Sequence, residues 1–131
     1  MPIESALLTK LLATSAVTNL AGQRIYYAGR TPTDVTSPYV VIQTISDVPA
    51  HSHGGYSEYS AARIQISLFA STYLGTKSLA AVISDAIDGF VGTWSGVSIY
   101  SCLSDGSSDL PSNNDSKISG LEVDYLINYN E

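Results

Sequence analysis

The segment from His51 to Tyr56 (HSHGGY) contains the pair of residues best suited to metal chemistry. Two histidines one residue apart point the same way in an extended chain, so they can share a metal ion. A stable zinc site needs three or four ligands, and the nearest other donors, Asp47 and Glu58, belong to no motif that fixes their spacing. Because two glycines follow the histidines, we interpret the segment as the polar tip of a hairpin. A small metal-dependent enzyme using His51 and His53 remains an alternative.

Other catalytic signatures are missing from the sequence. Cys102 is the single cysteine, and no basic group or helix start lies next to it to lower its pKa. No nucleophile elbow of the G-x-S-x-G type is present, and no Lys-Ser or Lys-Thr follows Gly54-Gly55 as in a phosphate-binding loop. Asp85 and Asp88 fit the solvated side of an amphipathic helix. We therefore expect no enzyme, no metal and no cofactor.

The composition favours a protein that works against other proteins. Charged residues make up 14% of the 131 residues and hydrophobic ones 44%, with nine tyrosines. A tyrosine-rich surface with few charges is typical of protein interfaces. Residues 1–78 carry a net charge of +1 and residues 79–131 a net charge of −7. Because no cluster of Lys or Arg could neutralise a run of phosphates, we do not expect tight or sequence-specific nucleic-acid binding.

The chain shows no sign of a membrane or secretory location. No apolar stretch approaches the ~20 residues needed to span a bilayer, and the N-terminus lacks the basic head of a signal peptide. A single cysteine also fits a reducing compartment. We expect a soluble protein made in the cytoplasm, with no membrane partner.

Hydrophobic periodicity predicts one domain over residues 1–131, of the α+β class. We expect an antiparallel sheet of about four strands with two helices packed on one face. The expected elements are a helix over 3–14, a short turn over 15–22, an extended piece over 24–27, a loop over 28–38, strands over 39–48 and 59–70, a helix over 72–88, a strand over 97–103, a flexible loop over 105–116 and a strand over 121–129.

Alternation predicts which strand residues are buried. In the last strand, Leu121 and every second residue after it should face the core, with Glu122 and Asp124 on the polar face. Arg63 lies on the polar face of its strand, where it either pairs with Glu122 or Asp124 or contacts another protein. In the strand over 97–103 we expect Leu103 on the same face as Val97 and Ile99, and Cys102 on the other.

Several segments taken together resemble the tail-completion proteins of long-tailed bacteriophages, which include tail terminator (tail-to-head joining) proteins. The segments are 24–32 (RIYYAGRTP), 38–43 (PYVVIQ), 62–66 (ARIQI), 70–73 (ASTY), 87–90 (IDGF) and 120–125 (GLEVDY). Their order and spacing carry the resemblance over nearly the whole chain. Gly75 departs from the family pattern, which has an acidic residue three positions after the helix-capping Thr, and so removes a capping box.

The resemblance implies a structural protein of the virion, assembled in the host cytoplasm. It implies a ring-forming subunit, usually present in six copies, at the head-proximal end of the tail tube. The ring stops tube polymerisation and offers a docking surface to the head, so its partners are other copies of the chain, the tail tube protein and the head–tail connector or head-completion protein. DNA passes through its centre without specific recognition.

On that basis we assign candidate contact and channel residues. The candidate interface residues are His51, His53, Tyr56, Tyr59, Arg63, Leu110 and Asn113. The candidate acidic residues of the channel wall are Asp105, Asp109, Glu122 and Asp124. The alternatives are a head-completion or connector adaptor, a tail-tube subunit, and a monomeric binding module.

Overall fold

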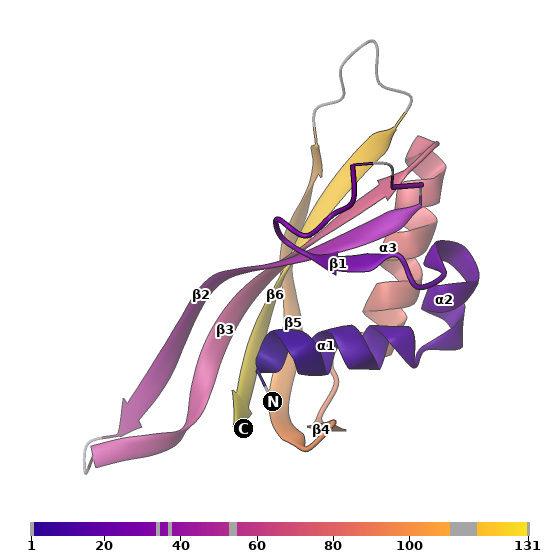
Figure 1. Ribbon diagram of the computed structural model, residues 1–131. Helices are drawn as coiled ribbons and strands as arrows, with labels where there is room; N and C mark the ends of the chain where they lie inside the picture. Colours follow the sequence, from indigo (N-terminus) through magenta and orange to yellow (C-terminus); the bar gives the residue numbers. More distant parts are fainter. Residues whose placement is uncertain (1, 34, 37, 53–54, 111–117, 131) are drawn as a thin grey trace.

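The computed structural model (Figure 1) describes residues 2–33, 35–36, 38–52, 55–110 and 118–130, with the backbone alone described for residues 50–52 and 55–58. Its elements are α1 (Ile3–Leu12), α2 (Ser15–Ala21), β1 (Ile25–Tyr27), β2 (Tyr39–Ser52), β3 (Gly55–Ala70), α3 (Tyr73–Ile87), β4 (Gly92–Trp94), β5 (Val97–Leu110) and β6 (Ser119–Asn130).

The six strands form one twisted sheet in the order β1-β2-β3-β6-β5-β4. All neighbours are antiparallel except β1 and β2, which are parallel. The α+β class is confirmed, whereas the predicted four antiparallel strands are corrected to a six-stranded mixed sheet. The difference comes from β1 and β4. β1 lies within the extended piece predicted over 24–27, which was not counted as a strand of the sheet, and β4 has three residues, too few to show a periodic pattern.

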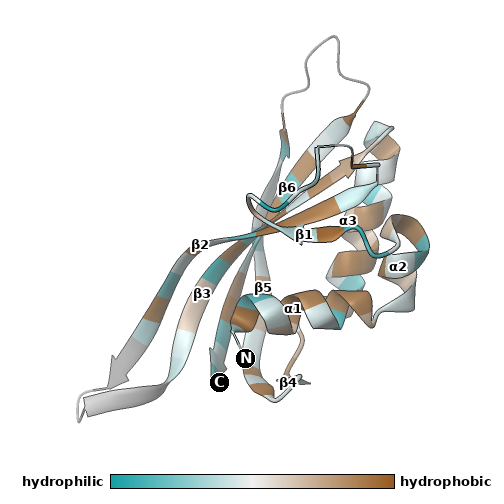
Figure 2. Cartoon of the chain, viewed as in Figure 1, coloured by the Kyte–Doolittle hydropathy of each residue, from teal (hydrophilic) through white to brown (hydrophobic). Residues whose placement is uncertain are grey.

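The three helices cover one face of the sheet (Figure 1), one more than predicted because the turn after α1 forms the helix α2. The core lies between the helices and the sheet (Figure 2). It is formed by hydrophobic side chains on one side of each helix and at every second position of the strands. The helical residues in that core are Ile3, Ala6, Leu7, Leu11, Val17, Ala21, Leu79, Ile83 and Ile87. The sheet contributes Val40, Ile42, Ala62, Ile64, Ile66, Leu68, Leu121, Tyr125, Ile127 and Tyr129, as alternation predicts for β3 and β6.

The start of α3 explains the glycine that departs from the family pattern. Thr72 is the N-cap, and its side-chain oxygen accepts a hydrogen bond from the Gly75 backbone N–H at 3.0 Å. A Cβ at position 75 would lie 2.9 Å from Thr72 Oγ1 and 3.1 Å from Ala70 Cβ. The glycine therefore leaves room for the cap, and the loss of the capping box does not remove capping by Thr72.

A β-bulge in β5 reverses the predicted orientation of two residues. Ile99 pairs with Tyr129 and Ser101 with Asn128, so Tyr100 is the extra residue in the ladder. Cys102 is therefore fully buried on the helix side, whereas Leu103 is 56% exposed on the opposite face. Burial raises the pKa of the Cys102 thiol to about 12, which keeps it protonated at neutral pH.

Two segments predicted as loops lie partly in strands. β5 continues to Leu110, so the ladder includes the first half of the predicted loop 105–116, while residues 111–117 lie outside the described part of the chain. Likewise β2 reaches Ser52 and β3 begins at Gly55, which makes their connection short. This β2–β3 hairpin extends past the helical layer (Figure 1). Both polar segments are held by cross-strand hydrogen bonds, which override their weak strand propensity.

Gly120 allows a close contact on the face opposite the helices. A Cβ there would lie 3.0 Å from Leu110 Cβ on β5 and 3.2 Å from Phe69 Cε1 on β3. Phe69 in turn stacks on Tyr39, with ring centroids 4.7 Å apart. Leu110 and Phe69 therefore close over the glycine at this end of the sheet.

Replacing Gly120 with valine is expected to reduce the free energy of unfolding by about 1–3 kcal/mol, because the added methyl groups overpack this contact. Denaturant unfolding followed by circular dichroism measures the change. Ala61→Val is the matched control, since Ala61 is exposed on β3 and should change stability by less than about 0.5 kcal/mol. Equal stability of Gly120→Val and wild type would contradict the close packing.

Candidate functional site

The face of the sheet that carries no helix, here called the open face, holds a cluster of charged and polar residues at its centre. Arg63 on β3 donates from Nη1 to Asp105 Oδ2 at 2.6 Å and from Nη2 to Asp124 Oδ2 at 2.9 Å. Glu122 accepts from the Gln65 side chain and, at 3.0 Å, from Ser108 Oγ. We call this group the acidic cluster; its members are Arg63, Gln65, Asp105, Ser108, Glu122 and Asp124.

The acidic cluster has an excess of negative charge. Three carboxylates face one guanidinium, and the other donors are neutral. The hydrogen bonds that Arg63 donates to Asp105 and to Asp124 raise the pKa of its guanidinium, which stays charged. The side chains of Arg63 and Asp105 are 33% and 47% exposed, which leaves the charge accessible from solvent. The cross-strand pairing of Arg63 with Asp124 is one of the two roles that alternation predicted.

Next to the acidic cluster, towards the β2–β3 hairpin, the open face is hydrophobic. Leu103 and Leu126 are cross-strand neighbours, and Tyr59 meets Tyr100 edge to face with ring centroids 6.3 Å apart. Two shallow hollows of about 400 and 320 Å³ lie here and share Asn128 as a lining residue. The exposed members, here called the apolar patch, are Val48, Tyr59, Tyr100, Leu103 and Leu126. Such a patch is typical of a surface that another protein covers.

Two predicted site residues lie apart from the acidic cluster. Asp109 is on the helix side, where its carboxylate accepts from the Tyr73 hydroxyl at 3.2 Å and lies 3.8 Å from Lys77 Nζ. Leu110 is half-buried against Gly120 within the same chain. The structure therefore brings Asp105, Glu122 and Asp124 together with Arg63, and leaves Asp109 on the opposite face.

The remaining predicted residues lie wholly or partly outside the described part of the chain. His53 and Asn113 are outside it, and for His51 and Tyr56 only the backbone pairing between β2 and β3 is described. Within the described residues, no three His, Cys, Asp or Glu side chains are grouped to hold a metal ion. No helix in the described ranges is long and apolar enough to cross a membrane.

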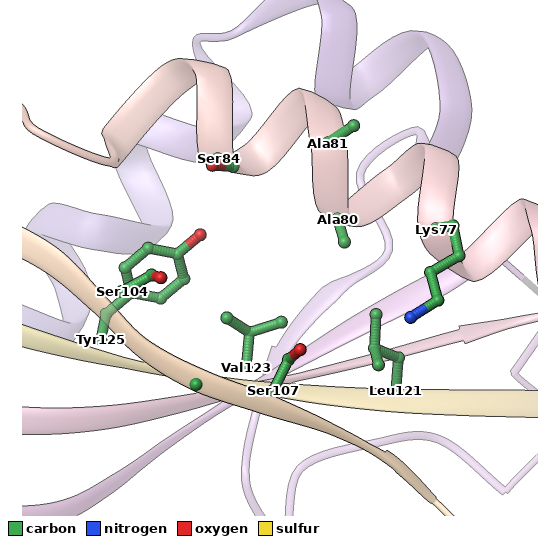
Figure 3. A pocket seen from close by; sticks show the side chains of 10 residues that line it. Lys77, Ala80, Ala81, Ser84, Ser104, Ser107, Leu121, Val123 and Tyr125 are labelled. Atoms are coloured by element: carbon green, nitrogen blue, oxygen red, sulfur yellow. The ribbon is translucent and has the colours of Figure 1, made fainter.

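A groove of about 320 Å³ separates α3 from β5 and β6 on the helix side (Figure 3). In Figure 3 the Tyr125 hydroxyl points towards Ser84, and the Lys77 side chain extends from α3 above the strands. Burial raises the pKa of Tyr125 to about 12, while its hydrogen bond with Ser84 acts in the opposite direction. Tyr125 is thus not an acid–base group at neutral pH, and small and aliphatic side chains provide much of the remaining lining.

Sequence reasoning missed several members of these surfaces. Leu126 could have been found, because strict alternation in β6 places it on the same face as Asp124. Gln65 shares the polar face of β3 with Arg63 for the same reason. Leu103 could not have been found, since the β5 register shift at Tyr100 has no clear sequence signal. Asp105 was among the predicted channel residues, but alternation did not predict its contact with Arg63.

The fold is thus α+β, and the open face of its sheet carries an acidic zone beside an apolar zone. A family model described as tail completion protein gp17 matches residues 5–127, and the chain belongs to this family. No curated protein matches the chain significantly. A solved chain from a structure titled "Virion of native gene transfer agent (GTA) particle" is similar in fold, with a TM-score of 0.79 and 17% identity over 98% of this chain and 95% of that chain.

Family membership confirms the resemblance found in the sequence. The chain is a tail-completion protein, a structural component of the virion tail.

Replacing Arg63 with alanine is expected to lower the thermal unfolding midpoint, most strongly at low salt. Without the guanidinium, the carboxylates of Asp105, Asp124 and Glu122 repel one another. This repulsion acts over a long range at about 0.01 M salt and is nearly screened at about 1 M salt. Calorimetry at the two salt concentrations measures the difference from wild type. Arg30→Ala removes the same charge from an exposed turn and should show little change. A salt-independent loss for Arg63→Ala would show that packing, not charge, is responsible.

Proposed function

We propose that the protein forms a ring, of six copies, on the head-proximal end of the tail tube. The ring ends tube polymerisation, offers a surface to the head–tail connector or head-completion protein, and lets DNA pass through its central channel. It acts through the shape and polarity of its surfaces and catalyses no reaction. Membership of the tail-completion family supports a place at the end of the tail, and the acidic cluster supports the channel wall.

The acidic cluster suits a wall along which DNA must slide. Like charges repel over the Debye length of about 8–10 Å at physiological salt, so a negative wall keeps the phosphate backbone from adhering. Each copy contributes three carboxylates against Arg63 on the open face, and a ring repeats this excess around the channel. A wall rich in Lys or Arg would instead bind DNA and slow its exit.

The apolar patch suits contact with protein. Leu103 and Leu126 are 56% and 42% exposed in the single chain, and Val48 is 58% exposed. Side chains of this kind are stabilised when a neighbouring subunit or layer removes them from water. The open face therefore divides into an acidic zone for the channel and an apolar zone for assembly.

Electron microscopy of the purified protein and of the parent particle tests the proposal. We expect closed single rings from the purified protein, and one ring at the head-proximal end of the tail tube in the particle. Long tubes, or density repeating along the tail, would identify a tail-tube subunit instead. Density on the head side of the junction alone would identify a connector adaptor. A single small species at every concentration would identify a monomeric binding module.

Replacing Glu122 with lysine is expected to slow DNA ejection without preventing assembly. Glu122 receives hydrogen bonds from the neutral Gln65 and Ser108, so its charge can be reversed while the Arg63 ion pairs remain. The measurement is the rate of DNA release from purified particles that carry the variant, with particle yield as the readout of assembly. Asp85→Lys makes the same charge change on the exposed side of α3 and should release DNA at the wild-type rate. Normal ejection by Glu122→Lys particles would count against an acidic channel wall.

A further inference from the structure

Both lateral edges of the sheet are incomplete. β4 pairs with residues 97–99 of β5 and β1 with residues 40–42 of β2. Among the described residues, β5 over 101–110 and β2 over 43–52 therefore have a partner strand on one side only. Such stretches leave backbone groups without a strand partner and are commonly covered by another chain or blunted. On β5, two of these groups are bonded within the chain: the Cys102 carbonyl accepts from the Gly89 N–H, and the Ser104 N–H donates to Asp88.

Both edges are interrupted in ways that restrict which chain can cover them. The ladder of β2 shifts near Ile45 and near Ala50, and Pro49 lacks a backbone N–H. The ladder of β5 shifts at Tyr100 and again near Gly106. These interruptions disfavour indiscriminate strand addition, so the side chains along the edges decide which partner fits.

The charged side chains differ between the β1 side and the β5 side of the sheet. In the described segment 22–33 beside β1, the charged side chains are Arg24 and Arg30, and Arg30 is exposed. Further along the same edge, Asp47 on β2 accepts a hydrogen bond from the Tyr129 hydroxyl at 2.5 Å. At the other edge, the charged residues of β5 are Asp105 and Asp109, and Asp88 joins them through a hydrogen bond from the Ser104 backbone N–H at 3.0 Å.

The cations that face the acidic edge compensate for it only in part. Lys77 lies 3.8 Å from Asp109 with both side chains about half exposed, and Arg63 is shared between Asp105 and Asp124. The three carboxylates on the β5 side, Asp88, Asp105 and Asp109, therefore keep an excess of negative charge there.

We propose that the basic β1 side of one copy lies against the acidic β5 side of the next copy, as the head-to-tail interface of the ring. This inference rests on the proposed function and identifies its assembly contact. Cyclic rings require two different patches that meet, and the two sheet edges are different and complementary. Opposite charges select this pairing over basic-on-basic or acidic-on-acidic contacts, since like charges at an interface cost several kcal/mol.

Charge reversal on each edge, followed by mixing, tests the proposal. The basic-edge variant carries Arg24→Glu and Arg30→Glu, and the acidic-edge variant carries Asp88→Lys and Asp109→Lys. Each variant alone brings like charges together and should reduce the ring population at least about tenfold, measured by native mass spectrometry. An equimolar mixture should restore rings in which the two variants alternate, because every contact then joins opposite charges again.

Controls separate misfolding from lost assembly. Circular dichroism and thermal unfolding of each variant report the fold of the single chain, and Asp85→Lys should form rings like wild type. Wild-type-like rings from either edge variant alone, or folded variants whose mixture stays unassembled, would overturn the edge contact. Open wild-type chains whose length depends on these same charges would keep the edge contact and overturn the closed ring. A wild-type protein that stays monomeric at all concentrations would overturn both.

Discussion

The rest of the structure depends on the central position of β6 in the sheet. This last strand of the chain pairs with β3 on one side and with β5 on the other. Because side chains alternate, the register that buries Leu121 and Tyr125 under the helices also places Glu122 and Asp124 on the open face beside Arg63. A slip of one residue would expose the hydrophobic row and bury the carboxylates, so one pairing specifies both the core and the surface.

Where strands alternate strictly, the sequence predicts both faces. The buried rows of β3 and β6 and the pairing of Arg63 with Asp124 follow from period two alone. In β5 the same reasoning is wrong for Leu103 and Cys102, because the extra residue Tyr100 reverses the side chains between it and the second register shift, which lies between Ser104 and Ser107. A bulge is decided by how the whole strand fits its neighbour, and hence no local pattern gives its position.

The polar segment after Ser104 shows how tertiary contacts override composition. Its Asp, Ser and Gly residues are typical of a loop, yet Asp105 meets Arg63, Ser108 meets Glu122 and Asp109 meets Tyr73. Each partner lies on another element, up to 42 positions away in sequence. Such contacts cannot be deduced from the sequence of the segment itself. They also position Asp105 and Glu122, two residues of the proposed channel wall.

A wall that repels DNA must also withstand repulsion among its own carboxylates. Arg63 holds two of the three, and neutral donors from Gln65 and Ser108 hold the third, so the geometry is kept while the excess negative charge remains. Full neutralisation by a second cation would stabilise the subunit further but would remove the repulsion that the channel needs. In a ring, the excess from each copy adds to that of its neighbours across the lumen. The attraction between the basic β1 side and Asp88 and Asp109 of the next copy offsets that cost at the contacts between subunits, through carboxylates that the proposed channel wall does not use.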